Sequence, residues 1–354
     1  MKLLNLEKTK ALMQQKEENQ EFDSYAVYVR YGDYEATMTS DIVNEDTYFD
    51  MASCGKVLVT SSLVLQAIAQ GKLSLEDTID TFFDAVPEDK KTITIKHLLT
   101  HTSGIIRHRY SPSLAGQSHD AFAKEILAQP LAFAVGSDYT YSCSGMVLLG
   151  FILEKVYQTS LEQVFETQLK KPLGYTRSRF NIAVDEPNSA KCYHTKTMDG
   201  YTSPWDDNNI RVLQTSAGSG GQFFTLADVK KFVKAVLEQD ERLYPKETFA
   251  LAEQNHAPSC AKESRGLGWL YVDEKYHQTG KLFEDGSFGH CGWSGQSIFF
   301  NRARQMCVVI LTNATRFLYR KNGWNSGADD TIIHRLREQI HNEIYSDLKA
   351  QNLI

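Results

Sequence analysis

The stretch FDMASCGKVLVTSSLVLQAIAQGKLSLEDTID, residues 49–80, joins a long apolar run to a serine, a cysteine and a lysine. From Ser53 to Gln70 the residues are apolar on nearly all sides, which predicts a buried helix that ends at Gly71. Ser53 and Lys56 are spaced i, i+3, so both side chains lie on one face of the first turn. There the amine can accept the hydroxyl proton, and the helix dipole favours developing negative charge. Cys54 is rotated by about 100° and points elsewhere, so the spacing favours Ser53 as the nucleophile.

An S-x-x-K match is expected about once by chance in a chain of this length. The chain contains another match, SCAK, at Ser259 to Lys262. The SCAK match follows Pro258 and runs into ESRGLG, which offers no long apolar helix to hold the pair. We therefore predict that it is a surface loop.

The composition is that of an ordinary globular protein. With 354 residues, 42% of them hydrophobic, the chain can bury one large core or two. The formal net charge of -6, without a basic block, argues against nucleic acid as a partner. No apolar run reaches membrane-spanning length, and the start MKLLNLEKTKALMQQKEENQ predicts a surface helix rather than a signal peptide. A cytoplasmic location is the resulting expectation, with secretion as the alternative if a leader has been removed.

Six cysteines are scattered through the chain without a CxxC pair or a zinc-like spacing. Free thiols, no metal site and no cofactor are therefore expected. The cysteines stand at positions 54, 143, 192, 260, 291 and 307.

Strand patterns occur near both ends of the chain. SYAVYVRYGDYEATMT alternates around Gly32-Asp33, which predicts a hairpin, and a short strand ends near TYFDMAS. The stretches GLGWLYVDE, SIFFNRA and QMCVVILTN return to strand character, and an amphipathic helix, DDTIIHRLREQIHNEIY, closes the chain. Between them lie helical pieces, and Thr225 with Asp228 predicts a capping box for the helix LADVKKFVKAVLE.

These patterns predict an α/β (α+β) fold whose antiparallel sheet is formed from both termini and flanked by helices. The predicted sheet domain comprises residues 1–75 and 215–354, and residues 76–214 form an inserted, mostly helical domain. The active site is expected in the cleft between the two.

Two further stretches fit the chemistry of Ser53. In YTYSCSGMVLLGFILEKV, Tyr141 precedes a turn and a buried helix. In FGHCGWSGQSIFF, we expect His290-Cys291-Gly292 to open a strand in which Gly292 lets a ligand approach the backbone closely.

Together with IKHLLTHTSGI and SAGSGGQFFTLADVKKF, these motifs follow in order from about residue 25 to 315. The ordered set resembles the serine β-lactamases and penicillin-binding-protein-like hydrolases, the group of class C β-lactamases, D-amino-acid peptidases and family VIII esterases. The resemblance implies a β-lactamase/transpeptidase-like fold.

The resemblance also implies roles for named residues. Ser53 would be the acylated nucleophile, Lys56 its proton partner, and Tyr141 the general base and then the general acid. The oxyanion hole would consist of the backbone N–H groups of Ser53 and Trp293. A charged Lys56 near Tyr141 would lower the pKa of the tyrosine.

Two departures from the family pattern bear on the substrate. His-Cys-Gly replaces Lys-Thr-Gly, and a histidine is often uncharged near neutral pH, which disfavours a β-lactam. Cys143 stands where an asparagine is expected, and a thiol is a weak donor and acceptor, which favours esters or small acyl groups over peptides. Cys143, His290, Cys291 and Gly292 are the expected substrate-binding residues.

The motif cysteines Cys54, Cys143 and Cys291 have two interpretations: small buried side chains that fill a tight site, or pocket thiols that make turnover redox-sensitive. The stretch SPWDDNNIRVLQTSAG, with Trp205, Asp206 and Asp207, is expected to form a loop over the pocket. Its acidic residues either attract an amine or are solvated.

The predicted function is that of a serine hydrolase acting through a Ser53 acyl-enzyme on small-molecule esters or amides, without a cofactor. Three alternatives stay open: an acyltransferase to an alcohol, a β-lactamase, and a non-catalytic protein that binds a β-lactam or peptide. Cys143 is the feature that most favours the last alternative, whereas intact Ser53, Lys56 and Tyr141 argue against it.

Overall fold

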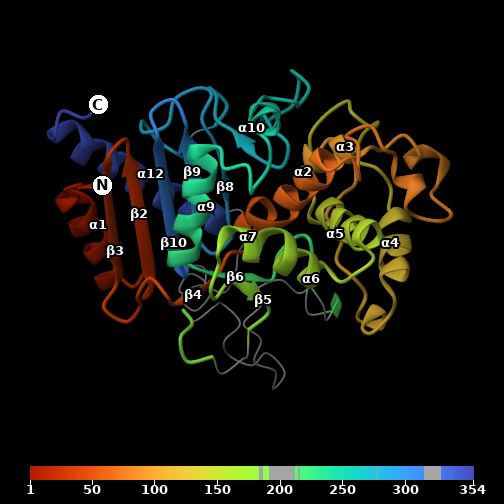
Figure 1. Cartoon of the computed structure of the whole chain (residues 1–354), viewed down its shortest axis with the longest axis horizontal. Coiled ribbons are helices and arrows are strands. Elements are labelled where there is room, and N and C mark those ends of the chain that lie inside the picture. Colours follow the sequence, from red (N-terminus) through yellow and green to blue (C-terminus); the bar gives the residue numbers. More distant parts are fainter. Residues whose placement is uncertain (183–185, 191–211, 214–215, 277, 315–327) are drawn as a thin grey trace.

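The computed structural model describes residues 1–182, 186–190, 212–213, 216–276, 278–314 and 328–354. Its main element is a seven-stranded sheet of order β1-β3-β2-β10-β9-β8-β7 (Figure 1). The strands in that order are β1 (Lys2–Leu3), β3 (Tyr34–Thr39), β2 (Tyr25–Tyr31), β10 (Met306–Thr312), β9 (Ser297–Asn301), β8 (Phe288–Cys291) and β7 (Leu270–Tyr271).

The two ends of the chain meet in the middle of this sheet. β2 pairs antiparallel with β10, from Tyr25 opposite Thr312 to Tyr31 opposite Met306. All other neighbours are antiparallel as well, except that β1 runs parallel to β3. The predicted hairpin is confirmed, because β2 and β3 pair across a turn in which Gly32 has φ 56°. The predicted antiparallel sheet from both termini is therefore confirmed.

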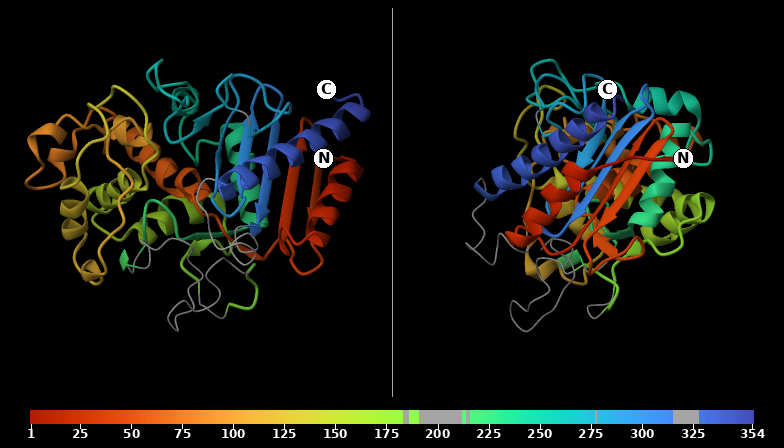
Figure 2. Two further views of the ribbon diagram at one scale, coloured as in Figure 1. Left: turned by 180° about the vertical axis from the view of Figure 1, so that it is seen from behind. Right: turned by 90° about the vertical axis from the view of Figure 1, so that its left-hand side faces the viewer.

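Helices cover both faces of the sheet, which explains why its central strands are apolar at successive positions. Val27 and Val29 pack with helices α1 (Glu7–Glu18) and α12 (Ala328–Ala350). Ala26 and Tyr28 belong to the other core, which includes residues of α9 (Leu226–Glu238). Figure 2 shows α1 and α12 side by side on one face, with α9 on the opposite face.

Most of the remaining helices lie in the right-hand half of Figure 1, away from strands β2 and β3. A π-helical segment, Lys56–Ser61, continues as α2, so the predicted buried helix is present with a π start. The helices are α2 (Ser62–Ala69), α3 (Ile95–Leu99), α4 (His119–Leu127), α5 (Cys143–Tyr157), α6 (Leu161–Phe165), α7 (Lys171–Leu173) and α10 (Lys246–Ala252). We propose, as the sequence predicts, that residues 76–214 form a domain inserted between 1–75 and 215–354.

A small sheet of order β4-β6-β5 lies where the helices and the large sheet meet (Figure 1). Its strands are β4 (Tyr48–Asp50), β6 (Gln222–Thr225) and β5 (Arg179–Phe180). β4 leads directly into the residues that precede Ser53.

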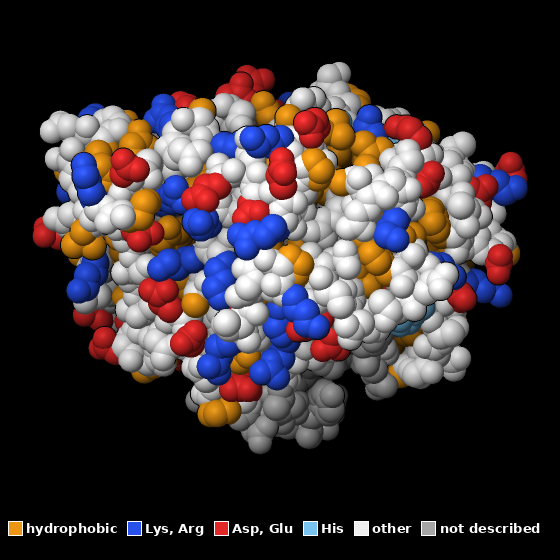
Figure 3. Space-filling model, in the orientation of Figure 1, with side chains coloured by type: hydrophobic (Ala, Val, Ile, Leu, Met, Phe, Trp, Pro, Cys, Tyr) orange, Lys and Arg blue, Asp and Glu red, His pale blue; other side chains and the backbone are white. Residues whose placement is uncertain are grey.

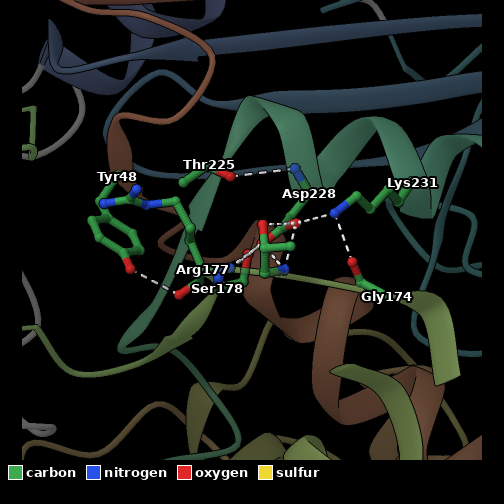
Figure 4. A network of polar contacts seen from close by, with 8 residues as sticks. Tyr48, Gly174, Arg177, Ser178, Thr225, Asp228 and Lys231 are labelled. Atoms are coloured by element: carbon green, nitrogen blue, oxygen red, sulfur yellow. Dashed lines mark hydrogen bonds and ion pairs between the residues drawn. The ribbon is translucent and has the colours of Figure 1, made fainter. Parts of the chain in front are cut away.

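The predicted capping box of α9 forms only in its first half. The Thr225 side chain accepts the Asp228 N–H at 3.3 Å, but the Asp228 carboxylate turns away to the backbone N–H groups of residues 176–178 and to Lys231 (Figure 4). Burial alone would raise the pKa of Asp228, but these donors together hold it below its ordinary value. The carboxylate thus ties α9 to the chain that follows α7.

Acidic and basic side chains are interspersed over the face shown in Figure 3. Within the described residues, no helix is both long and apolar enough to span a membrane. The SCAK match, at Ser259 to Lys262, lies outside helices and strands, with three of its four residues exposed, so its prediction as a surface loop is confirmed.

Candidate active site

Ser53 lies at a sharp turn between β4 and the helical run that follows. The preceding residue, Ala52, has φ 45°, a left-handed conformation that is costly for a residue with a side chain. The Asp50 carboxylate supports the turn by accepting the Ala52 N–H at 2.8 Å. The turn presents Ser53 to a pocket that Tyr141 and His290 also line.

The structure brings the three predicted catalytic residues together. The Lys56 Nζ donates to Ser53 Oγ at 2.9 Å and to the Ser219 carbonyl at 2.6 Å. The Tyr141 hydroxyl donates to Ser53 Oγ at 2.7 Å, from the residue before the N-cap of α5. The serine oxygen is therefore held between an amine and a phenol, either of which is close enough to serve as the adjacent base that activates a nucleophile.

Burial decides the protonation of Tyr141. It raises the pKa of the phenol above its ordinary value, while Lys56 acts in the opposite direction. The lowering by Lys56 that the sequence suggested is thus present, but burial outweighs it. At neutral pH the phenol keeps its proton, consistent with its hydrogen bond to Ser53.

His101, for which the sequence analysis predicts no role, holds the Tyr141 segment in place. Its ring lies 4.7 Å from the Tyr141 ring between centroids, and its Nδ1 accepts the Ser142 N–H at 3.3 Å. Its carbonyl accepts the Thr140 N–H at 3.0 Å. Burial and the charge of Arg265 keep the pKa of His101 well below its ordinary value, so the imidazole is neutral. Its only sequence signal is its place in the LTHTSG motif.

Arg265 is a second residue that the sequence did not reveal. Its buried guanidinium donates to the Tyr139 hydroxyl and to Glu263, both at 2.6 Å. The same group lies 5.7 Å from the centre of the Tyr141 ring. A cation there favours the deprotonated form of the phenol.

Cys54 is separated from the reacting atoms, as the helical spacing predicted. Its side chain is fully buried, and its Sγ contacts the His290 carbonyl at 3.5 Å. Burial raises the pKa of the thiol far above its ordinary value, which leaves it protonated.

The His290-Cys291-Gly292 motif ends β8 instead of opening a strand, so that expectation was wrong. The chain turns after Cys291, where Gly295 N–H donates to the Gly292 carbonyl at 3.2 Å. A Cβ on Gly292 would lie 2.9 Å from the Met51 carbonyl. The structure therefore accounts for this glycine by the close approach of the chain's own backbone.

His290 contributes no positive charge to the site. Burial, Arg265 and Lys56 hold the pKa of the imidazole well below its ordinary value. Its Nδ1 bonds to the Cys291 carbonyl at 2.8 Å, which assigns the proton to Nδ1. Nε2 is then an acceptor, and it has no partner among the described residues. Cys291 itself lies next to Tyr276, with 3.1 Å between sulfur and hydroxyl.

A pocket of about 460 Å³ joins these groups. Seven of the eight predicted site residues line it: Ser53, Tyr141, Cys143, His290, Cys291, Gly292 and Trp293. The eighth, Lys56, is almost completely buried beside Ser53. Trp205, Asp206 and Asp207, expected to cover the pocket, lie outside the described residues.

The pocket wall also carries charge. Three arginines line it, Arg107, Arg265 and Arg337, together with the acids Asp50 and Glu263. No set of three or more His, Cys, Asp or Glu side chains in the described part of the chain is arranged to hold a metal ion.

A serine held by a lysine and a tyrosine, at the junction of this sheet and these helices, is the arrangement of serine hydrolases with the β-lactamase/transpeptidase fold. The Beta-lactamase family profile matches residues 12–327, and the chain belongs to this family.

Relatives by sequence carry the names of hydrolases. A protein of Escherichia coli O157:H7 that carries the provisional name D-alanyl-D-alanine carboxypeptidase is 26% identical over 309 residues, 75% of this chain and 69% of that protein. An N-acetylmuramyl-L-alanine amidase of Bacillus subtilis is 25% identical over 304 residues, 75% of this chain and 68% of that protein. The family and these names indicate a serine hydrolase.

Two solved structures share the fold. EstCE1, described as a hydrolase with promiscuous acyltransferase activity, aligns with a TM-score of 0.74 and 21% identity, over 94% of this chain and 98% of that one. A simvastatin synthase mutant from Aspergillus terreus aligns with a TM-score of 0.73 and 19% identity, over 97% and 95% of the two chains.

Proposed function

We propose that the protein hydrolyses small-molecule esters or amides through an acyl-enzyme on Ser53. The observation that carries this proposal is the position of Ser53 Oγ, 2.9 Å from the Lys56 amine and 2.7 Å from the Tyr141 hydroxyl. Once either of these groups has lost its own proton, it can accept the serine proton as the oxygen attacks.

Lys56 and Tyr141 act as one acid–base pair in this mechanism. The active form of the pair has lost one proton, whether it is written as amine with phenol or as ammonium with phenolate. This form takes the serine proton while Oγ bonds to the substrate carbonyl carbon. It then gives that proton to the leaving group as the carbonyl–leaving-group bond breaks. Water repeats both steps and releases the acid.

The negative oxygen that forms on the carbonyl needs donors. The Ser53 N–H has no hydrogen-bond partner among the described residues, and Trp293 lines the same pocket one residue after Gly292. We assign the oxyanion hole to the backbone N–H groups of Ser53 and Trp293.

The groups around Ser53 favour esters. Cys143, which lines the pocket at the first position of α5, offers only a weak donor and acceptor for a substrate amide. His290 is neutral, so it does not replace the cation that the lysine of a Lys-Thr-Gly motif offers to a β-lactam carboxylate.

A D-alanyl peptide is the second candidate substrate. The relative named for D-alanyl-D-alanine carboxypeptidase supports it, and so do the three arginines of the pocket wall, which can attract a terminal carboxylate.

Intact mass after exposure to a fluorophosphonate tests the nucleophile in wild type, Ser53→Ala and Cys54→Ala. We expect a single adduct on wild type and on Cys54→Ala, and none on Ser53→Ala. An adduct on Ser53→Ala would refute Ser53 as the nucleophile.

Turnover of a p-nitrophenyl ester, a peptide ending in D-alanyl-D-alanine and a cephalosporin then ranks the substrates. The proposal expects the ester to have the highest kcat/KM. A higher kcat/KM for the peptide would replace the ester by the second candidate.

A further inference from the structure

Arg337 reaches the candidate active site from the C-terminal helix α12. Its side chain is buried, lines the same pocket as Ser53, and donates through Nη2 to the Gly292 carbonyl. Its Nη1 donates to Gln278 Oε1 at 2.7 Å.

The Gly292 carbonyl and the Trp293 N–H belong to one peptide group. Resonance couples the two ends of such a group, because electron density withdrawn toward the oxygen gives the nitrogen more positive character. A cation that donates to the oxygen therefore makes the N–H a stronger donor, as hydrogen bonds in series polarise one another. We propose that Arg337 is a positioning residue that strengthens and orients the Trp293 N–H as an oxyanion donor. This inference rests on the function proposed above.

The charge of Arg337 is the feature that a purely structural role leaves unexplained. In the described part of the chain its hydrogen-bond partners are a carbonyl and an amide oxygen, and it forms no ion pair with a carboxylate. A buried, unneutralised cation is costly to fold, and a neutral side chain could fill the same space. The cost is offset if the charge acts on an anion that forms during the reaction.

The surroundings of Gly292 fix the direction of the polarised group. Gly292 N–H donates to the Gln296 carbonyl at 2.8 Å, and the Gln296 amide donates to the Asp50 carbonyl at 2.6 Å. The turn is thus fastened to the strand that leads to Ser53. These bonds hold the N–H side of Gly292, and Arg337 holds its carbonyl side.

Three variants separate this role from a structural one. Arg337→Met removes the charge, Arg337→Lys keeps it, and Arg335→Met is the matched control, an exposed arginine two residues earlier on the same helix. Rates on a p-nitrophenyl ester are divided by the number of active sites, counted from the endpoint of fluorophosphonate labelling.

Arg337→Met should lower kcat by about 10-fold with KM nearly unchanged, a smaller effect than the 10²–10³-fold loss of a whole oxyanion donor. Arg337→Lys should recover most of the rate, and Arg335→Met should match wild type. Wild-type kcat per active site in Arg337→Met would overturn the inference, whatever the change in melting temperature.

An aryl boronic acid gives a second readout. Boron accepts the Ser53 oxygen while the serine proton leaves, so the adduct is tetrahedral and anionic like the transition state. The inhibition constant of Arg337→Met should rise by about the same factor as kcat falls, because both depend on the oxyanion donor. An unchanged inhibition constant would contradict the role of Arg337.

Nuclear magnetic resonance tests the polarisation without any catalysis. Labelling with ¹³C-carbonyl glycine and ¹⁵N tryptophan selects only Gly–Trp peptide groups, of which the sequence has three, at 268–269, 292–293 and 323–324. In Arg337→Met the Trp293 ¹⁵N signal should move upfield while the Trp269 signal stays. An unmoved Trp293 signal refutes the polarisation, whereas failure of the proposed function shows separately as a fluorophosphonate adduct on Ser53→Ala.

Discussion

Tyr141→Phe removes one atom from the centre of the proposed mechanism. The lost hydroxyl lies 2.7 Å from Ser53 Oγ, while the ring keeps its place against His101 at 4.7 Å between centroids. The variant therefore changes proton transfer and leaves the packing intact.

The expected loss of kcat in Tyr141→Phe depends on the groups that still contact Ser53. A general acid–base group contributes about 10²–10⁴-fold to the rate, and a factor of ten corresponds to about 1.36 kcal/mol in the barrier. Lys56 keeps its 2.9 Å contact with Ser53 and can still take the proton. We therefore expect the lower end of the range for Tyr141→Phe, a loss of about 10²-fold in kcat, or ~2.7 kcal/mol.

The assay is steady-state hydrolysis of a p-nitrophenyl ester by wild type, Tyr141→Phe and Tyr175→Phe, with melting temperatures as a check on folding. Tyr175 is the matched control, a buried tyrosine whose hydroxyl has no partner in the described part of the chain. Loss of the Tyr175 hydroxyl should leave kcat unchanged. A kcat of Tyr141→Phe within threefold of wild type would refute the assignment of Tyr141 to proton transfer.

Three further predictions concern the acid–base pair, the buried carboxylate of Asp228 and the turn at Gly292. Because the acid–base pair must lose a proton and burial raises the pKa of Tyr141, kcat/KM of wild type should rise from pH 7 into the alkaline range, and a flat profile would contradict the pair. Asp228→Asn should lower the free energy of unfolding at pH 7 by about 3 kcal/mol in urea titrations, since it removes a buried, hydrogen-bonded charge. The folded pKa of Asp228 is depressed, so its stabilisation is present above the unfolded pKa and is lost as pH falls through the folded value; a deficit that persisted in acid would argue against the charge as its source. Gly292→Ala should cost about 1–3 kcal/mol in stability, because the new Cβ would meet the Met51 carbonyl at 2.9 Å, and it should slow ester hydrolysis by displacing Trp293; wild-type values for both would show that the turn can adjust.

Several features of the fold could be predicted because their causes are local. Alternation around Gly32 predicted the hairpin of β2 and β3, and apolar residues on all sides predicted the buried helix after Ser53. The i, i+3 spacing placed Lys56 beside Ser53 and directed Cys54 away, since one helical turn fixes both directions. The family resemblance added Tyr141, which is 88 residues distant in sequence from the serine it contacts.

Other features depended on segments that only the folded chain brings together. The Asp228 carboxylate had a local partner in the predicted capping box but lies against three N–H groups of residues 176–178 instead. The strand that contains His290 ends at Cys291, and the chain turns where a Cβ on Gly292 would crowd the carbonyl of Met51, a residue from a different part of the sequence.

The charges of the site also depend on segments that only the folded chain brings together. Arg265 and Arg337 stand in sequence surroundings that do not mark them as functional, yet both side chains are buried at the pocket that Ser53 lines. The net effect on Tyr141 likewise depends on burial, which overrides the nearby Lys56. The sequence by itself thus determined which groups could react, because residue type and helical spacing are local. Only the tertiary structure decided their protonation and the supporting charges, because desolvation and Coulomb interactions depend on distances between remote segments.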